Sequence, residues 1–106
     1  MGPSATVYKE LGGLVKLRCT VETPGSEVRW YKNGKHILMK KFSKFHIKKK
    51  KSRNRTLSYE ILVFKAEQDS SGKYKCTVKA KTNSWEQRQN WDVKIGKSFM
   101  STNFFH

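Results

Sequence analysis

Alternation of apolar and polar residues dominates this chain, which is the pattern of strands with one face buried and the other in solvent. The clearest run covers residues 14–21, where every second residue is apolar and most residues between them are polar. Residues 28–31, 74–78 and 91–95 repeat the pattern more briefly, and turn-forming residues separate the runs. The sequence therefore predicts an all-β fold made of short strands.

The alternation also predicts which side chains face the core. A short strand around residues 35–39 is expected after an Asn33-Gly34 hairpin, because both residues tolerate positive φ. Residues 49–55 are interpreted as a loop or ragged hairpin, and Thr82-Asn83 begins another turn. Val7 is expected in a first strand. The predicted inward-facing residues are Val15, Leu17, Cys19 and Val21; Val28 and Trp30; Phe45 and Ile47; Leu57, Tyr59, Ile61 and Val63; Tyr74, Cys76 and Val78; and Trp91, Val93 and Ile95.

Four residues anchor this arrangement: Cys19, Trp30, Tyr74 and Cys76. With them, the stretch Trp-Tyr-Lys-Asn-Gly-Lys from residue 30 and the segment Asp-Ser-Ser-Gly-Lys-Tyr-Lys-Cys from residue 69 make the chain resemble the immunoglobulin superfamily. It resembles the intermediate (I-set) type most. The resemblance implies a two-sheet Greek-key sandwich in which a Cys19–Cys76 disulfide joins the sheets over Trp30 and Tyr74 forms the tyrosine corner.

One position departs from the family pattern. The family usually has Asp six residues before the second Cys, paired with a basic residue near the fourth main strand. Here Ser70 occupies that position, and Asp69 comes one residue early. Either the corner around Tyr74 is reshaped, or the ion pair is missing.

A length of 106 residues allows one domain, which we place at residues 5–96. Residues 1–4 are interpreted as added rather than native sequence, so that a signal peptide or membrane anchor is expected to have been removed. Residues 97–106 are expected to form a flexible tail. No stretch approaches 18 apolar residues, so no membrane insertion is expected in this fragment.

The net charge of +15 is concentrated in one segment. Residues 28–59 contain 12 Lys or Arg residues and no Asp or Glu, whereas the rest of the chain contains 11 basic and 8 acidic residues. Such an asymmetry informs about partners rather than about fold. It predicts a polyanion-binding region, with heparan sulfate as the expected ligand, formed by Lys40, Lys41, Lys44, Lys48, Lys49, Lys50, Lys51, Arg53 and Arg55.

Other interpretations of the charged residues stay open. The basic run could be a solvated edge that prevents aggregation, and it also resembles a nuclear localisation run, although nucleic-acid binding is not favoured. Asn54 begins a glycosylation sequon, and a glycan there would shield the basic loop. Arg29, Lys73, Lys75, Lys79 and Lys94 are expected to share one face of the other sheet, where a half-solvated sheet surface is favoured over a second basic binding face.

Trp85 lies near a turn, where it is a candidate protein contact or a cover for the end of the sandwich. Catalysis is not predicted, because His36, His46 and His106 have no evident Ser or Asp partner. No metal or cofactor motif is present.

We therefore expect an extracellular or cell-surface binding module that takes part in receptor, ligand or adhesion contacts. Two cysteines suggest a bridge and an oxidising compartment. The alternatives are an intracellular, cytoskeletal module of the titin or palladin kind with free thiols and an actin-like partner, and a structural spacer.

Overall fold

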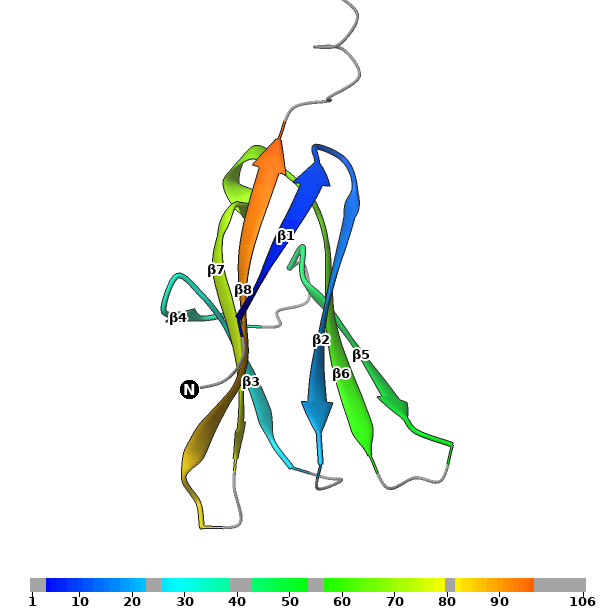
Figure 1. Ribbon diagram of the computed structural model, residues 1–106, viewed down its shortest axis with the longest axis vertical. Helices are drawn as coiled ribbons and strands as arrows, with labels where there is room; N and C mark the ends of the chain where they lie inside the picture. The colour runs from blue at the N-terminus through cyan, green and yellow to red at the C-terminus, as the bar shows by residue number, and fades with distance from the viewer. Residues whose placement is uncertain (1–3, 23–25, 39–42, 54–56, 80–81, 97–106) are drawn as a thin grey trace, which may run out of the picture.

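The computed structural model describes residues 4–22, 26–38, 43–53, 57–79 and 82–96. These residues form two β-sheets packed face to face (Figure 1). The elements are β1 (Ser4–Glu10), β2 (Leu14–Val21), β3 (Val28–Lys32), β4 (Lys35–His36), β5 (His46–Lys51), β6 (Ser58–Lys65), the 3-10 helix η1 (Gln68–Ser70), β7 (Gly72–Lys79) and β8 (Trp85–Gly96). The predicted tail, residues 97–106, lies outside the described residues.

The strand order is β1-β8-β7-β3-β4 in the five-stranded sheet and β2-β6-β5 in the three-stranded sheet. β1 pairs with β8 in parallel, and the other paired strands are antiparallel. The chain passes between the sheets from β1 to β2, from β2 to β3, from β4 to β5 and from β6 to β7. The predicted all-β, two-sheet sandwich is therefore confirmed.

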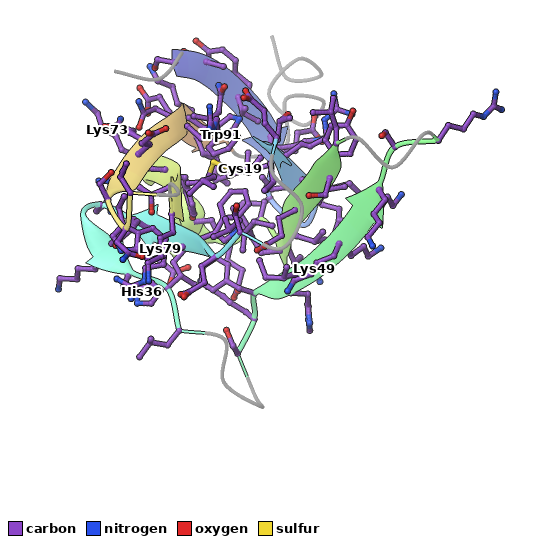
Figure 2. All side chains as sticks on the ribbon, turned by 90° about the horizontal axis from the view of Figure 1, so that it is seen from below. Cys19, His36, Lys49, Lys73, Lys79 and Trp91 are labelled. Atoms are coloured by element: carbon purple, nitrogen blue, oxygen red, sulfur yellow. A yellow bond between two sulfur atoms is a disulfide. The ribbon has the colours of Figure 1, made fainter. Side chains whose placement is uncertain are left out.

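The core lies between the sheets and is centred on the Cys19–Cys76 disulfide, which joins β2 to β7 across a Cα–Cα distance of 6.3 Å. Trp30 and Trp91 stack with ring centroids 5.5 Å apart, and Phe64 stacks on Tyr74 at 5.1 Å. Figure 2 shows Cys19 and Trp91 in the space between the sheets. In the chain-entropy description, a cross-link over a separation of 57 residues stabilises the fold by about 4 kcal/mol.

The predicted faces of β2 and β7 are confirmed. Every second residue of β2, from Val15 to Val21, is buried, and the residues between them are exposed or half-buried. Tyr74, Cys76 and Val78 of β7 are buried in the same way. Near the disulfide, the apolar residues of these two strands fall only at every second position. The period of two therefore determines which face is buried.

The prediction of which β6 side chains face the core is wrong, because the strand buries the opposite set of residues. Leu62 and Phe64 enter the core at 0% and 1% exposure, whereas Tyr59, Ile61 and Val63 lie on the opposite face of the sheet. Residues 61–64 are all apolar, so the strand has no period of two there and the sequence does not choose a face. Pairing with β2 makes the choice, because Leu62 lies opposite the buried Leu17.

The Asn33-Gly34 hairpin is confirmed, with φ angles of 50° and 81°. It leads into β4, which covers only Lys35–His36 of the strand expected over residues 35–39; residue 39 lies outside the described residues. The hairpin is attached to β7, because the Lys73 backbone N–H donates to Asn33 Oδ1 at 2.9 Å. A side chain at Gly72 would collide with Asn33, since its Cβ would lie 2.7 Å from that oxygen.

β8 contains a β-bulge that reverses its two faces. Gln89 pairs with Cys76, but the next pair is Gln87 with Thr77, so Arg88 is the extra residue. Trp91 lies six positions after Trp85, so the two side chains would share a face in a regular strand. Because of the bulge, Trp91 points into the core, whereas Trp85 pairs with Lys79 on the outer face.

Candidate functional site

The lysine run from residue 48 to residue 51 lies in a regular strand. β5 pairs with β6 as far as Lys51, which lies opposite Ser58. The turn then closes through Ser52, whose backbone N–H donates to the Leu57 carbonyl at 2.8 Å and whose Oγ accepts from the Leu57 N–H at 3.1 Å. Of the loop or ragged hairpin predicted over residues 49–55, the loop is wrong for residues 49–51, because cross-strand pairing extends through them as part of a β5–β6 hairpin.

The pleat of β5 sends these four lysines to two faces. Lys48 and Lys50 pair with Ile61 and Tyr59, which point away from the core. Lys49 and Lys51 pair with Glu60 and Ser58 on the side that faces the other sheet. All four side chains are exposed, because β5 is the edge strand of its sheet. Strand geometry therefore divides a run that is uniform in sequence into two pairs.

Lys49 and Lys51, the pair on the core side of β5, line a pocket beside the sheet. A pocket of about 310 Å³ is bordered by Lys49, Lys51 and Glu60, and Lys50 and Tyr59 also contribute to its rim. Glu60 Oε1 accepts a hydrogen bond of 3.2 Å from Trp30 Nε1. Burial raises the pKa of the Glu60 carboxyl, and both the Trp30 hydrogen bond and the charge of Lys49 oppose that rise.

Lys48 and Lys50 share their face with cations of β2 and β6. We name as the outer face of the three-stranded sheet the residues that point away from the core. They are Leu14, Lys16, Arg18 and Thr20 of β2; Tyr59, Ile61, Val63 and Lys65 of β6; and His46, Lys48 and Lys50 of β5. This described set contains no Asp or Glu.

Sequence reasoning missed Lys16, Arg18 and Lys65 as partners of the lysine run. Part of this arrangement could have been found from the sequence, because the alternation of β2 already places Lys16 and Arg18 on the outward face. Their distance from residue 48 in sequence concealed the proximity, which arises only because β6 pairs with both β2 and β5. The guanidinium carbon of Arg18 lies 4.9 Å from the centroid of the Tyr59 ring, which holds the cation on this face.

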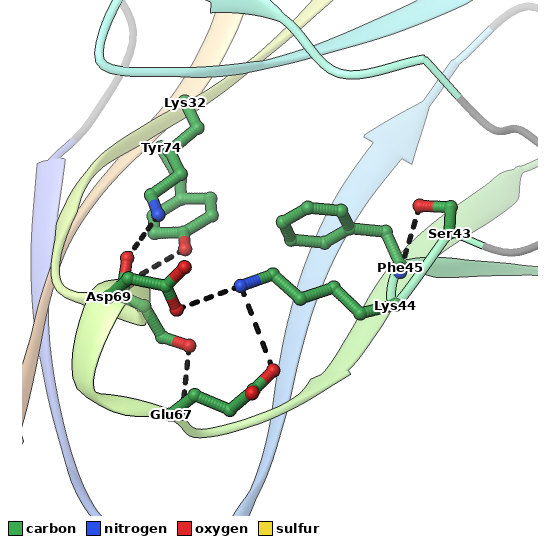
Figure 3. Close-up of polar contacts among 8 residues, drawn as sticks. Lys32, Ser43, Lys44, Phe45, Glu67, Asp69 and Tyr74 are labelled. Atoms are coloured by element: carbon green, nitrogen blue, oxygen red, sulfur yellow. Dashed lines mark hydrogen bonds and ion pairs between the residues drawn. The ribbon is translucent and has the colours of Figure 1, made fainter.

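Lys44 behaves differently from the lysines of β5, because acidic residues surround it (Figure 3). Its Nζ lies 2.9 Å from Asp69 Oδ1 and 3.7 Å from Glu67 Oε1. The hydrogen bond and the charge of Lys44 lower the pKa of the Asp69 carboxyl. Lys32 Nζ donates to the Asp69 carbonyl oxygen, so two cations converge on the turn before β7.

The tyrosine corner is intact although Ser70 replaces the usual Asp. The Tyr74 hydroxyl donates to the Ser70 carbonyl at 2.7 Å, and burial raises the pKa of that hydroxyl. Ser70 is fully buried, and its Oγ accepts from the Glu67 backbone N–H at 2.8 Å. Asp69 forms the ion pair with Lys44 from one residue earlier, so neither the corner nor the ion pair is lost.

The remaining candidates of the basic region are placed only in part. Arg53 is described and exposed. Four of the predicted residues lie outside the described residues: Lys40, Lys41, Asn54 and Arg55. His36 lies on β4, with its ring 5.4 Å from that of Tyr31, and His46 begins β5.

The second basic face is present on the outer side of the five-stranded sheet, but most of its cations have local partners. Lys75 Nζ lies 4.7 Å from the centroid of Tyr31, and Lys94 Nζ lies 5.9 Å from that of Tyr8. Lys79 Nζ is 3.8 Å from Glu27 Oε1. Figure 2 shows Lys73 and Lys79 on this side of the sandwich. The face is therefore a mixture of cations, aromatic rings and an acid.

Trp85 lies on the same outer side, at the start of β8. The guanidinium carbon of Arg29 lies 4.2 Å from the centroid of the Trp85 ring, and the indole is half-buried. Trp85 therefore does not enter the core.

Among the described residues, no helix has the length and apolar character that crossing a membrane requires. No group of three or more His, Cys, Asp or Glu side chains within the described part of the chain could hold a metal ion.

Comparison with known proteins gives one family match. The family model described as Immunoglobulin domain matches residues 5–89. No curated protein matches the chain at a significant level.

Several solved structures are similar to the chain. An Ig-like domain of human obscurin-like protein 1 has a TM-score of 0.67 at 15% identity, covering 89% of this chain and 78% of that one. A tandem of titin Ig domains has a TM-score of 0.61 at 21% identity, covering 86% of this chain and 43% of that one. The N-terminal eight Ig domains of Down Syndrome Cell Adhesion Molecule give a TM-score of 0.64 at 20% identity, covering 83% of this chain and 11% of that one. The chain thus spans less than half of the two multi-domain chains.

Proposed function

The chain belongs to the immunoglobulin domain family, whose members mediate contacts between proteins, and we propose that this member also binds heparan sulfate. The proposed role is that of a non-catalytic I-set module in a secreted or cell-surface protein. It takes part in receptor, ligand or adhesion contacts and carries a sulfated glycan on its basic region.

The observation that supports the proposal is the group of cations on β5 and the turn after it. Lys48, Lys49, Lys50, Lys51 and Arg53 are exposed. Within the described part of the chain, the cations that form ion pairs are Lys44, Lys79 and Arg88, and none of the five exposed cations is among them. Their mutual repulsion is relieved when a polyanion neutralises them and releases its own counterions.

The proposed contacts are unequal. Lys carries a compact charge, and Arg offers a fork of donors that suits a sulfate group. Lys44 extends the strip only by leaving Asp69 and Glu67, so we expect it to contribute less. Lys40, Lys41 and Arg55 are proposed contacts outside the described residues. A glycan on Asn54 is an alternative use of the same connection, so the test uses protein without that glycan.

Trp85 is the proposed anchor for a protein partner. It is paired with Arg29 at one end of the five-stranded sheet, and Trp and Arg are two of the residue types that contribute most to binding at protein interfaces. Its position on the opposite sheet from β5 would leave the glycan and the protein partner room to bind at once.

The proposed compartment follows from the disulfide. The Cys19–Cys76 bridge is favoured in oxidising compartments. The alternative, an intracellular cytoskeletal module that binds actin, has support from the similarity to titin and obscurin-like domains. Protein taken from its native source should contain no free thiol by intact-mass measurement after alkylation. Two alkylated cysteines would favour the intracellular alternative.

Retention on immobilised heparin tests the ligand. The wild-type domain should elute at high salt, and Ser at all of residues 48–51 should lower the elution salt sharply, because four charges are lost. The control carries Ser at Lys35, Lys73, Lys75 and Lys94, which removes the same charge from the other sheet. Unchanged retention of the first variant would show that the site is wrong.

The same preparations distinguish the alternatives. Stronger co-sedimentation with actin filaments than binding to heparin at equal salt would favour the cytoskeletal reading. A domain that binds neither heparin nor actin filaments would support the third interpretation, a structural spacer.

A further inference from the structure

The outer face of the three-stranded sheet has the arrangement of a binding site for a linear anion. We propose, building on the proposed function, that a sulfated glycan lies along this face. It is held between Lys16 and Arg18 of β2 on one side and Lys48 and Lys50 of β5 on the other. Lys49 and Lys51, although adjacent in sequence, make no direct contact with the glycan on this face and contribute to the basic region only through their long-range charge.

The register of the sheet sets the shape of the site. Arg18, Ile61 and Lys48 form one row across the three strands. Neighbouring strands lie about 4.8 Å apart, so the cations of β2 and β5 form two lines about 10 Å apart. Along each strand the outward residues repeat every ~6.7 Å. Two parallel lines of charge at this spacing suit a narrow chain that carries anions on both sides.

An apolar stripe of Tyr59, Ile61 and Val63 runs between the two lines of cations. Val63 is only 5% exposed, although it lies on the outer face between Lys16 and His46 in the register. Long basic side chains bury their methylene stems along such a stripe and hold the charged heads in water. A ligand over the stripe would therefore meet charged heads on both sides.

No carboxylate competes for these cations on the outer face. The described outward residues of β2, β6 and β5 include no Asp or Glu, and the ion pairs of the described chain involve none of Lys16, Arg18, Lys48 and Lys50. Arg18 rests over the Tyr59 ring, so less of its freedom is lost on binding.

The face suits a sulfated glycan better than a single-stranded nucleic acid. Proteins that bind single strands supply aromatic rings on which bases stack. Here the ring of Tyr59 already stacks with Arg18, and His46 is the only other aromatic side chain in the described outward set.

Lys49 and Lys51 are excluded by their direction. They point to the core side of β5, where Lys49 is close enough to Glu60 for its charge to act on that carboxylate. A ligand on the outer face meets the opposite side of the strand. The alternation therefore gives a matched comparison within four consecutive residues.

The test compares three double variants of the intact domain: Lys48→Ser with Lys50→Ser, Lys16→Ser with Arg18→Ser, and the control Lys49→Ser with Lys51→Ser. Each removes two charges. Binding to a size-defined heparin oligosaccharide is measured by titration at several salt concentrations. The two outer-face variants should each reduce the slope of log affinity against log salt by about two, and the control should reduce it by much less than one.

Equal losses from the control and the outer-face variants, or no loss from the β2 variant, would overturn the inference while leaving heparin binding in place. A wild-type domain that does not bind heparin would overturn the proposed function as well. Lysine acetylation of the wild-type protein gives an answer that does not depend on any variant folding. Heparin should protect Lys16, Lys48 and Lys50 from the reagent and leave Lys49 and Lys51 reactive, and the reverse pattern contradicts the site.

Discussion

The corner around Tyr74 and the outer face of the three-stranded sheet use cations in opposite ways. At the corner, Lys44 is joined to Asp69 and Glu67, and these contacts hold the segment before β5 against the turn before β7. On the outer face, Lys48 and Lys50 lie in a regular strand and make no ion pair within the described chain. Lys44 and Lys48 are four residues apart, so the difference comes from the neighbours that folding supplies.

The comparison shows that net charge in a sequence window does not measure the charge available to a ligand. All lysines of residues 44–51 appeared equivalent in the sequence. In the fold, one is neutralised by acids, two point to the core side of β5, and two point to the outer face. We expect substitutions at the corner to change the stability of the fold and to leave heparin binding unchanged.

The largest expected effect is at the corner, in Tyr74→Phe. The substitution removes the hydroxyl that donates to the Ser70 carbonyl and leaves that buried oxygen without its partner. We expect a loss of about 1–3 kcal/mol in the free energy of unfolding, measured by urea denaturation. Elution from heparin should not change. Tyr8→Phe is the control, because Tyr8 is 67% exposed. An equal loss of stability in both variants would show that the hydrogen bond from Tyr74 to Ser70 has no special role in stabilising the fold.

A smaller effect is expected from Asp69→Asn, which breaks the ion pair with Lys44. The pKa of Asp69 is lowered in the folded protein, so the ion pair stabilises the fold above the ordinary value of 3.8 and its contribution is lost as the pH falls through the lowered pKa. Wild type should therefore be more stable than the variant at neutral pH, and the two should converge in acid. Denaturation midpoints across this range measure the difference, and a gap that persists in strong acid contradicts the assignment.

Asp69→Asn also tests whether the corner around Tyr74 contributes to heparin binding. Asp69→Asn releases Lys44 from its carboxylate partner, so the elution salt on heparin should stay the same or rise slightly. A fall in elution salt would mean that the corner contributes to binding through something other than charge.

The smallest expected effect is at Glu60→Gln, on the core side of β5. Because burial raises the pKa of Glu60, the ionised side chain opposes folding relative to the protonated one. Gln keeps an oxygen for Trp30 Nε1, so at neutral pH the variant should equal wild type or exceed it by at most about 1 kcal/mol after solvent screening.

The way in which stability changes with pH tests the direction of the Glu60 pKa shift. Wild type should gain stability relative to the variant as the pH falls through the raised pKa toward the ordinary value of 4.5, and the gain should be complete below it. Denaturation of both proteins from neutral pH to about pH 4 measures this change. A difference that stays constant over the range would show that Glu60 is not buried as described. Glu60→Ala is the companion variant, and it should be less stable than Glu60→Gln because Trp30 Nε1 loses its acceptor.

Much of the frame was predictable from the sequence. The strands around Cys19 and Cys76 were placed on the correct faces, and the Asn33-Gly34 and Thr82-Asn83 turns were found, with φ of 65° at Asn83. These features are local, since a period of two or a positive φ is encoded within a few residues. The candidate site was predictable only as a set of charges, without its faces and without Lys16 and Arg18.

Alternation in the sequence was enough to predict short strands, and the resemblance to immunoglobulin domains implied the sandwich and its disulfide-linked core. The face that each functional residue occupies depended instead on how the strands pair in the folded protein. Residues 48–51 are uniformly charged and residues 61–64 are uniformly apolar, so neither run has a period of two. Pairing of β6 with β2 sets the faces of residues 61–64, and pairing of β5 with β6 sets those of residues 48–51. The bulge at Arg88 likewise turned Trp85 outward, and the turn before β7 brought Asp69 to Lys44. Each of these outcomes depends on partners distant in sequence, which no local pattern specifies.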